Sequence, residues 1–144
     1  DTLRQIFRTT RVIACVGASP RTERPSHYVS RFLQDRGYRV IPVNPGHAGA
    51  QLFGETAVAA LADITEPVDM IDVFRRSEHL LPIVEAALAS LPGLRTVWMQ
   101  IGVQNAEAAA LAESHGLIVV QNRCPKLEYP RLFGHRSLRE IAAA

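Results

Sequence analysis

The sequence predicts an α/β fold: a single doubly wound, Rossmann-like domain with a mostly parallel five-stranded sheet and helices on both faces. Short apolar runs alternate with amphipathic stretches along the chain, the pattern of repeated strand–helix units. After its first residue the run Arg11–Val16 is continuously apolar, as in a strand that helices cover on both faces. The connections between them are short, which is typical of right-handed βαβ crossovers.

Length and composition restrict the class of protein. The 144 residues, 47% hydrophobic and 21% charged, suit one folded domain with a full core. We expect residues 1–144 to form it, with a core over about 11–132, a short N-terminal helix and a C-terminal tail. A net charge of +2 without a long basic run does not favour nucleic acid as a partner. No apolar run reaches the ~18 residues of a membrane span, so we expect no membrane partner. The two cysteines, Cys15 and Cys124, are far apart and fit a reducing compartment, so we expect a cytoplasmic protein.

Five apolar runs are predicted to be the strands of the sheet. In chain order they are Arg11–Val16, Tyr38–Val43, Val68–Val73, Thr96–Met99 and Leu117–Val120. Pro42 has no N–H group to donate to a neighbouring strand, so the second run is expected at or near an edge.

Helix signals lie before and between the first strands. Residues 2–9 carry apolar side chains on one face and predict a short leading helix. Ser26 is expected to cap a helix that continues to about Arg36, with Gly37 just past its end. Residues 57–61 suggest a short helical turn.

The second half predicts two longer helices and an irregular tail. The first begins at Ser77 and its apolar stripe reaches Leu91. The second has Asn105 as its N-cap and runs to about His115. Because residues 123–134 contain two prolines, we expect them to be irregular, followed by a last helix over 137–144.

A small or polar cluster follows each predicted strand. The clusters are Gly17–Ser19, Asn44–Gly46, Phe74–Arg76, Gln100–Gly102 and Gln121–Cys124. Ligands of open parallel sheets bind at the carboxyl ends of the strands, where these clusters converge. Turns by themselves account for glycine, asparagine and proline, but not for Arg75 and Arg76 or for Gln100. We therefore predict a nucleotide-type site at this edge.

The loop after the first strand has the position of a pyrophosphate-binding turn. Gly17 permits a sharp turn, Ala18 and Ser19 let the main chain approach a phosphate, and Arg21 and Arg24 supply charge. Neither G-x-G-x-x-G nor G-x-x-x-x-G-K-[ST] is present, so the loop alone is a weak signal.

The residue after the second strand bears on which nucleotide is bound. Enzymes that use NAD place Asp or Glu there, on the ribose 2′-hydroxyl. This chain has Asn44 instead, which weighs against NAD and leaves NADP open.

Six segments taken together resemble a known family. They are VGAS (16–19), RPSHYV (24–29), GYRVIPVNP (37–45), VDMIDVFRR (68–76), VWMQIG (97–102) and RCPKLEYPRL (123–132). The chain resembles, over about 11–132, the small stand-alone CoA-binding proteins. Their domain is similar to the N-terminal CoA-binding domain of the succinyl-CoA synthetase alpha subunit.

The resemblance implies a Rossmann-like domain that holds coenzyme A (CoA) across its strand ends. It implies contacts of Gly17, Ala18, Ser19 and Arg24 with the phosphates, of Val43, Asn44 and Pro45 near the adenosine, of Phe74 and Arg75 beside the nucleotide or the pantetheine arm, and of Gln100, Ile101 and Gly102 along that arm.

The sequence also bears on catalysis. None of the five histidines lies in a version of the phosphohistidine motif that the succinyl-CoA synthetase alpha subunit carries in its second domain. No acid, base and nucleophile set accompanies the predicted loop. We therefore expect non-catalytic binding of CoA or acyl-CoA, as a sensor, buffer or carrier. The alternatives are an NADP-linked oxidoreductase or other acyl-CoA enzyme, and a ligase subunit that acts with a partner chain.

Several side chains have both a chemical and a structural interpretation. Arg123 and Lys126 flank Cys124 and would favour its thiolate and a mixed disulfide with CoA, but a small residue filling a tight turn is the preferred interpretation. Cys15 and Trp98 lie within strands and are assigned to the core. The cysteines have no C-x-x-C spacing and the histidines no metal-ligand spacing, so no metal site is expected.

Two further expectations concern contacts. Asp72, close to the end of its strand, is expected to pair with Arg75 or Arg76. Apolar residues of the tail would either seed self-association or cover the core; they are Leu132, Phe133, Leu138 and Ile141.

Overall fold

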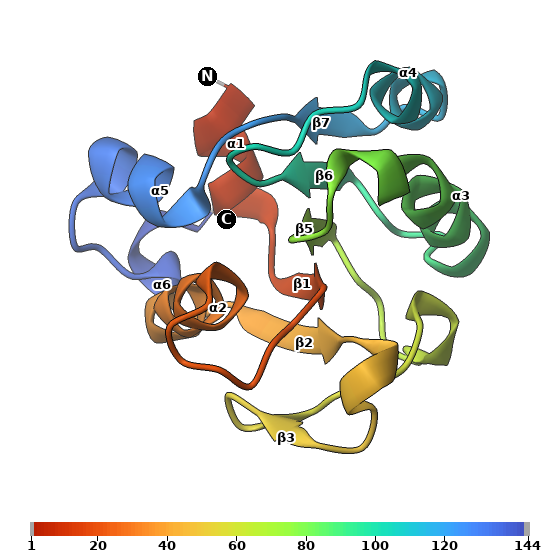
Figure 1. Cartoon of the computed structure of the whole chain (residues 1–144). Coiled ribbons are helices and arrows are strands. Elements are labelled where there is room, and N and C mark those ends of the chain that lie inside the picture. Colours follow the sequence, from red (N-terminus) through yellow and green to blue (C-terminus); the bar gives the residue numbers. More distant parts are fainter. Residues whose placement is uncertain (1, 143–144) are drawn as a thin grey trace.

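The computed structural model describes residues 2–142 and contains a five-stranded parallel sheet in the order β2-β1-β5-β6-β7 (Figure 1). The strands are β1 (Val12–Val16), β2 (Arg39–Val43), β5 (Met70–Val73), β6 (Thr96–Met99) and β7 (Ile118–Val120). Each coincides with a predicted strand to within two residues. β2 lies at the edge of the sheet, as Pro42 predicted.

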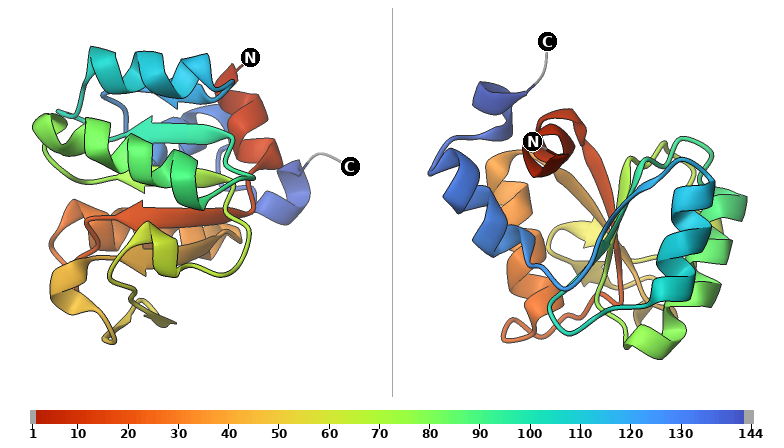
Figure 2. Two further views of the ribbon diagram at one scale, coloured as in Figure 1. Left: turned by 90° about the vertical axis from the view of Figure 1, so that its right-hand side faces the viewer. Right: turned by 90° about the horizontal axis from the view of Figure 1, so that it is seen from above.

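Helices cover both faces of the sheet (Figure 2). One face carries α1 (Thr2–Thr9), α2 (Pro25–Arg36), α5 (Pro125–Phe133) and α6 (Leu138–Ile141), and the other carries α3 (Leu80–Ser90) and α4 (Ala106–Ser114). Two apolar clusters fill the layers, one around Trp98 and Tyr129 and the other around Leu80 and Met99. The doubly wound architecture is therefore confirmed.

The strand order reverses beside β1. The chain goes from β1 to β2 on one side and then crosses to β5 on the other, so the switch point lies between β1 and β5. In open α/β sheets the crevice at such a point is where ligands bind, outside the carboxyl ends of the strands. The loops that follow β1 and β5 begin at Gly17 and Phe74 and frame this crevice.

A small hairpin extends beyond the edge strand. It consists of β3 (Gln51–Leu52) and β4 (Glu55–Thr56), which pair antiparallel. The N–H of Val58 then donates to the carbonyl of Pro42, so residues 57–60 do not form the predicted helical turn. A 3₁₀ helix occupies Leu61–Asp63 instead. The carbonyl of Pro42, on the edge strand, needs a hydrogen-bond donor, and this requirement outweighs the weak helical preference of these residues.

The predicted start of α2 is wrong. α2 starts at Pro25 with Arg24 as its N-cap, so Ser26 lies inside the helix and does not cap it. Proline is suited to a first helical position because its φ is preset and its missing N–H needs no partner there. The C-terminal end is as predicted, since Gly37 adopts a left-handed conformation with φ of 115°.

The tail is not irregular, because residues Pro125–Phe133 form α5. Pro125 occupies the first turn, and Pro130 removes one hydrogen bond from inside the helix. Burial of Tyr129 and Phe133 in the core outweighs this loss. The predicted last helix is limited to Leu138–Ile141, with Ser137 as its cap, and residues 143–144 lie outside the described part of the chain.

None of the helices over residues 2–142 combines the length and the apolar character that crossing a bilayer requires.

Candidate functional site

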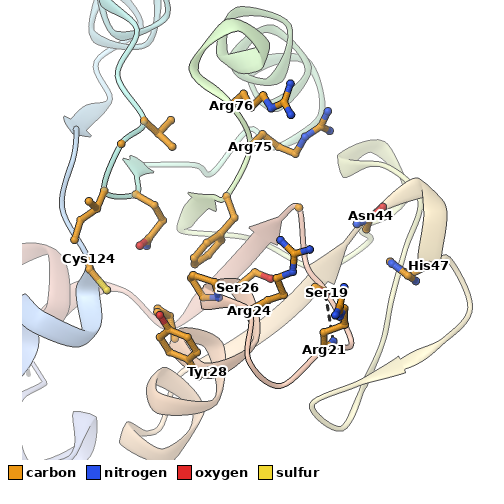
Figure 3. A pocket seen from close by; sticks show the side chains of 18 residues that line it. Ser19, Arg21, Arg24, Ser26, Tyr28, Asn44, His47, Arg75, Arg76 and Cys124 are labelled. Carbon is orange, nitrogen blue, oxygen red and sulfur yellow. Dashed lines mark hydrogen bonds between the residues drawn. The ribbon is translucent and has the colours of Figure 1, made fainter.

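A pocket of about 790 Å³ lies at the carboxyl edge of the sheet, within the usual range for small-molecule sites (Figure 3). Nine of the predicted site residues line it: Gly17, Ser19, Arg24, Asn44, Phe74, Arg75, Gln100, Ile101 and Gly102. Ala18 and Val43 do not, because they are buried below the loop, and Pro45 faces solvent outside it.

The first loop of the pocket is held by the main chain of β2. The N–H groups of Gly17 and Ala18 both donate to the carbonyl of Val43, at 2.9 and 3.3 Å. These two N–H groups are therefore engaged by the protein. Within residues 2–142 the N–H of Ser19 has no such partner, and it lies at the pocket wall.

Gly17 lies against the end of β5. Its φ is +88°, and a Cβ atom there would stand 2.9 Å from the carbonyl oxygen of Phe74 and 3.0 Å from Cδ of Arg75. Only glycine combines this conformation with such a close approach. The two loops at the switch point can therefore meet only because residue 17 has no side chain.

Basic side chains gather at the outer end of the pocket. Arg21, Arg24, Arg75, Arg76 and His47 all line it. Arg21 is paired with Glu23 at 2.8 Å. Over the described residues, Arg24, Arg75 and Arg76 make no ion pair with an acidic side chain. Together with the N-terminus of α2, which favours negative charge, they provide an uncompensated positive region suited to phosphates.

The floor of the pocket contains a buried polar pair. Gln100 lines the pocket, and its Nε2 donates to Oδ1 of Asp72 at 2.7 Å. Burial raises the pKa of Asp72 to about 7. The expectation that Asp72 pairs with Arg75 or Arg76 is wrong, because its side chain lies beneath the sheet edge among buried residues.

The inner end of the pocket is mostly uncharged. Figure 3 shows Tyr28 and Cys124 at this end, on the opposite side from Asn44 and His47. The pocket is therefore polarised, with charge at one end and apolar side chains with a thiol at the other.

Cys124 is not an activated thiol. Burial raises its pKa and outweighs the neighbouring main-chain N–H groups and the charge of Lys126, which both lower it, so the predicted net lowering is wrong. Arg123 is paired with Glu128 at 3.6 Å, and Lys126 lies 5.6 Å from the ring centre of Tyr28. Cys124 is half-buried, lines the pocket and is the N-cap residue of α5, so it does not fill a tight turn as expected.

The other residues considered for chemistry are structural. Cys15 and Trp98 are fully buried, and the indole Nε1 donates to the carbonyl of Arg123. Of the tail residues, Phe133, Leu138 and Ile141 are buried and cover the core. No cluster of metal-ligating side chains occurs among residues 2–142.

The last strand-end cluster mainly holds the neighbouring loops. Oδ1 of Asn122 accepts from the N–H of Gly102 at 2.7 Å, and Oε1 of Gln121 accepts from the N–H of Asn105 at 2.9 Å. Gln100–Gly102 is thereby fixed along the wall of the pocket.

Sequence reasoning missed the lining residues that come from α2 and from the turn after β2: Pro25, Ser26, Tyr28, Val29 and His47. A helix that begins at a strand end presents its first turns to the ligand crevice, and this placement was the available signal.

Comparison with known proteins identifies relatives over nearly the whole chain. A profile of the CoA binding domain family matches residues 11–130. The chain is 38% identical over 127 residues to the uncharacterized protein YneT of Bacillus subtilis (strain 168), covering 88% of this chain and 91% of YneT.

Solved structures agree with this relationship. A Thermus thermophilus protein, cell-free ID.343, superimposes with a TM-score of 0.87 at 42% identity, covering 92% of this chain and 97% of that one. A hypothetical protein of Pyrococcus horikoshii OT3 gives 0.86 at 35%, covering 92% and 91%. A Ca. Korarchaeum cryptofilum acetyl-coenzyme A synthetase 1 shares the fold, with a TM-score of 0.66 at 22% identity over 83% of this chain and 26% of its own. On the family match and these relatives, the chain belongs to the CoA binding domain family.

Proposed function

We propose that this protein binds coenzyme A, free or acylated, in the pocket at the carboxyl edge of its sheet and performs no chemistry on it. The observation that carries the proposal is the polarity of the pocket: unpaired arginines at one end, and uncharged side chains with a neutral thiol at the other. CoA has the same polarity, with a phosphorylated nucleotide at one end and an uncharged pantetheine arm at the other.

The nucleotide half would lie at the basic end. Ser19 offers a free main-chain N–H and a hydroxyl, and Arg24, Arg75 and Arg76 offer guanidinium groups that no carboxylate occupies. Such charge-assisted hydrogen bonds to phosphate are among the strongest that proteins make.

The pantetheine arm would follow the wall formed by Phe74 and Gln100–Gly102 toward Cys124. Ile101 is 59% exposed and Tyr28 is 43% exposed, so apolar surface is available at this end for an uncharged chain. Ligand burial would remove this surface from water.

Two titratable groups at the pocket support a binding role without catalysis. Cys124 is held as a neutral thiol, and Asp72 lies under the floor rather than at the pocket surface. Neither is placed as the nucleophile or base that acyl transfer requires. The protein would therefore sense, buffer or carry its ligand.

Calorimetric titration of the ligand-stripped protein with CoA, and in parallel with NADPH, tests the proposal. We expect a saturable isotherm with CoA and none with NADPH. Binding of NADPH without CoA would replace the proposal with an oxidoreductase function. Consumption of acetyl-CoA by the protein alone would disprove the non-catalytic part.

A further inference from the structure

The buried pair under the pocket floor has an asymmetry that bears on the ligand. Nε2 of Gln100 donates to Oδ1 of Asp72 at 2.7 Å, and the two residues are 6% and 1% exposed. The other carboxylate oxygen, Oδ2, is buried without a hydrogen-bond partner. A buried acid with one oxygen unsatisfied costs stability, which makes its presence beside a binding pocket informative.

The surroundings of Asp72 contain little that would neutralise it. Over the described residues it forms no ion pair. The titratable groups that interact with it are two thiols, Cys15 from β1 and Cys124 from the start of α5, and its charge raises the pKa of both. The state of this carboxyl group is therefore coupled mainly to Gln100.

An ionised carboxylate can only accept hydrogen bonds. While Asp72 is ionised, Gln100 must present its NH₂ group to Asp72, and its amide oxygen Oε1 is then turned away from the carboxylate. Because Gln100 forms part of the pocket wall, Oε1 becomes a hydrogen-bond acceptor available to a ligand.

We propose that Asp72 is a positioning residue that holds the amide oxygen of Gln100 toward the pocket, where it accepts a hydrogen bond from an N–H group of the pantetheine arm. This inference rests on the proposed function. The hydrogen bond to Gln100 would favour CoA over nucleotides that lack the pantetheine arm.

Protonation of Asp72 reverses the constraint. A neutral carboxyl group can donate its own O–H to Oε1 of Gln100, so the amide can turn over and present NH₂ to the pocket. The acceptor for the ligand is thus present above the pKa of Asp72, about 7, and is lost as the pH falls through it. Affinity for CoA should decrease in the same direction.

The test compares the wild type with Asp72→Asn, whose side chain is similar in shape but cannot ionise. CoA affinities are measured by calorimetry near pH 6 and near pH 8. We expect the two proteins to bind CoA alike near pH 6, and the wild type to bind about fivefold more tightly near pH 8, the effect of one hydrogen bond. Ionisation of the ligand itself cancels in this comparison.

Adenosine 3′-phosphate 5′-diphosphate, which lacks the pantetheine arm, serves as the matched ligand. Its affinity should be the same for both proteins at each pH. The inference would be overturned if the ratio of wild-type to Asp72→Asn affinity for CoA were the same near pH 6 and near pH 8. It would also be overturned if this ratio changed with pH in the same way for the truncated ligand. Neither outcome would contradict CoA binding itself. Absence of CoA binding by the wild type would instead overturn the proposed function.

Gln100→Met gives a second line of evidence that does not depend on Asp72→Asn folding. This variant retains the side-chain length but lacks the amide oxygen. We expect the ratio of wild-type to variant CoA affinity to grow by about fivefold between pH 6 and pH 8. A ratio that stays near one at both pH values would contradict the role of Gln100.

Discussion

The side-chain amide of Asn44 donates to the carbonyl oxygen of Ala18 at 2.9 Å and so joins the end of β2 to the loop that follows β1. Its Oδ1 accepts from the N–H of Gly46, also at 2.9 Å, and starts the 3₁₀ helix Pro45–His47. One side chain therefore fixes two loops of the pocket. At the position where enzymes of the NAD type carry an acid, this chain uses an amide because a carboxylate cannot donate to Ala18.

Asn44→Asp keeps the shape of the side chain and its bond to Gly46 but loses the donor to Ala18. It also places a negative charge at the pocket wall. We expect CoA affinity to fall by about tenfold or more, the cost of a lost hydrogen bond plus charge repulsion, with a lowered Tm. Calorimetry and thermal denaturation measure the two effects.

Asn105→Asp is the matched control for that variant. Asn105 also caps a helix, and its amide donates to the carbonyl of Ser77 at 2.9 Å, but it does not line the pocket. It should lose stability without losing affinity for CoA. If both variants lost affinity equally, the loss would reflect general destabilisation.

The arginines should contribute unequally. Arg24→Ala should weaken CoA binding by about 1–3 kcal/mol, because it removes an unpaired guanidinium from the phosphate end. Arg21→Ala should cost less, since Arg21 must leave Glu23 before it can bind phosphate. Titrations of both variants at low and high salt provide the check, and the loss for Arg24→Ala should shrink at high salt. If Arg21→Ala lost more CoA affinity than Arg24→Ala, then Arg21 would be the main phosphate-binding arginine of the two.

The strands could be predicted because each is a short, mainly apolar run that a small or polar cluster follows. Strand order could not, since nothing local in Val12–Val16 specifies which strands lie beside it; only Pro42 carried such information. Helix α5 was missed because prolines at 125 and 130 indicate a break, whereas burial of Tyr129 stabilises the helix from outside it.

For the pocket too, the residues of single segments could be predicted, but contacts between segments could not. Strand-end residues could be assigned because parallel strands share one carboxyl edge. The bond between Asp72 and Gln100 depends on β5 and β6 being neighbours, which the sequence does not state. Likewise, Tyr28 reaches the pocket only because the first turn of α2 lies at the strand ends.

Cys124→Ser should leave CoA affinity unchanged within about twofold, because it replaces one small neutral group with another. In the wild type, alkylation of Cys124 should be slower near neutral pH than that of an ordinary thiol, and its rate should still rise with pH where an ordinary thiol has levelled off, since burial raises its pKa. Cys15, which is fully buried, should remain unmodified until the protein unfolds. Rapid modification of Cys124 at neutral pH, or a large affinity loss in Cys124→Ser under reducing conditions, would contradict this.

Gly17→Ala should destabilise the protein and abolish CoA binding. Its Cβ would meet the carbonyl oxygen of Phe74 at 2.9 Å, so the β1 and β5 loops would have to separate. Gly116→Ala is the control, because Gly116 has a similar φ of +81° and a Cβ added there would meet nothing within 4 Å. Both variants should lose roughly 1 kcal/mol from backbone strain, and Gly17→Ala should lose more. Denaturant titrations with equal losses would exclude the close contact as the cause.

Asp72→Asn should stabilise the protein at neutral and alkaline pH. The folded-state pKa of Asp72, about 7, lies above its ordinary value of 3.8, so between these values the native state holds a proton that the unfolded state has released. The free energy of unfolding of the wild type therefore falls as the pH rises through this window, by at most about 1.4 kcal/mol per pH unit, and levels off above it.

The variant has no such proton, so its stability advantage should be small near pH 4 and greatest above about pH 7. Asp69→Asn should instead destabilise the protein, because Oδ2 of Asp69 accepts from the N–H groups of Arg11 and Val12 and its Oδ1 pairs with Arg95. Urea titrations of the three proteins between pH 4 and pH 8 compare them directly. A stability difference between Asp72→Asn and wild type that did not change with pH would mean that Asp72 ionises in the native state as readily as in the unfolded one. A difference that grows with pH would mean that the ionised side chain of Asp72 lowers the stability of the native state.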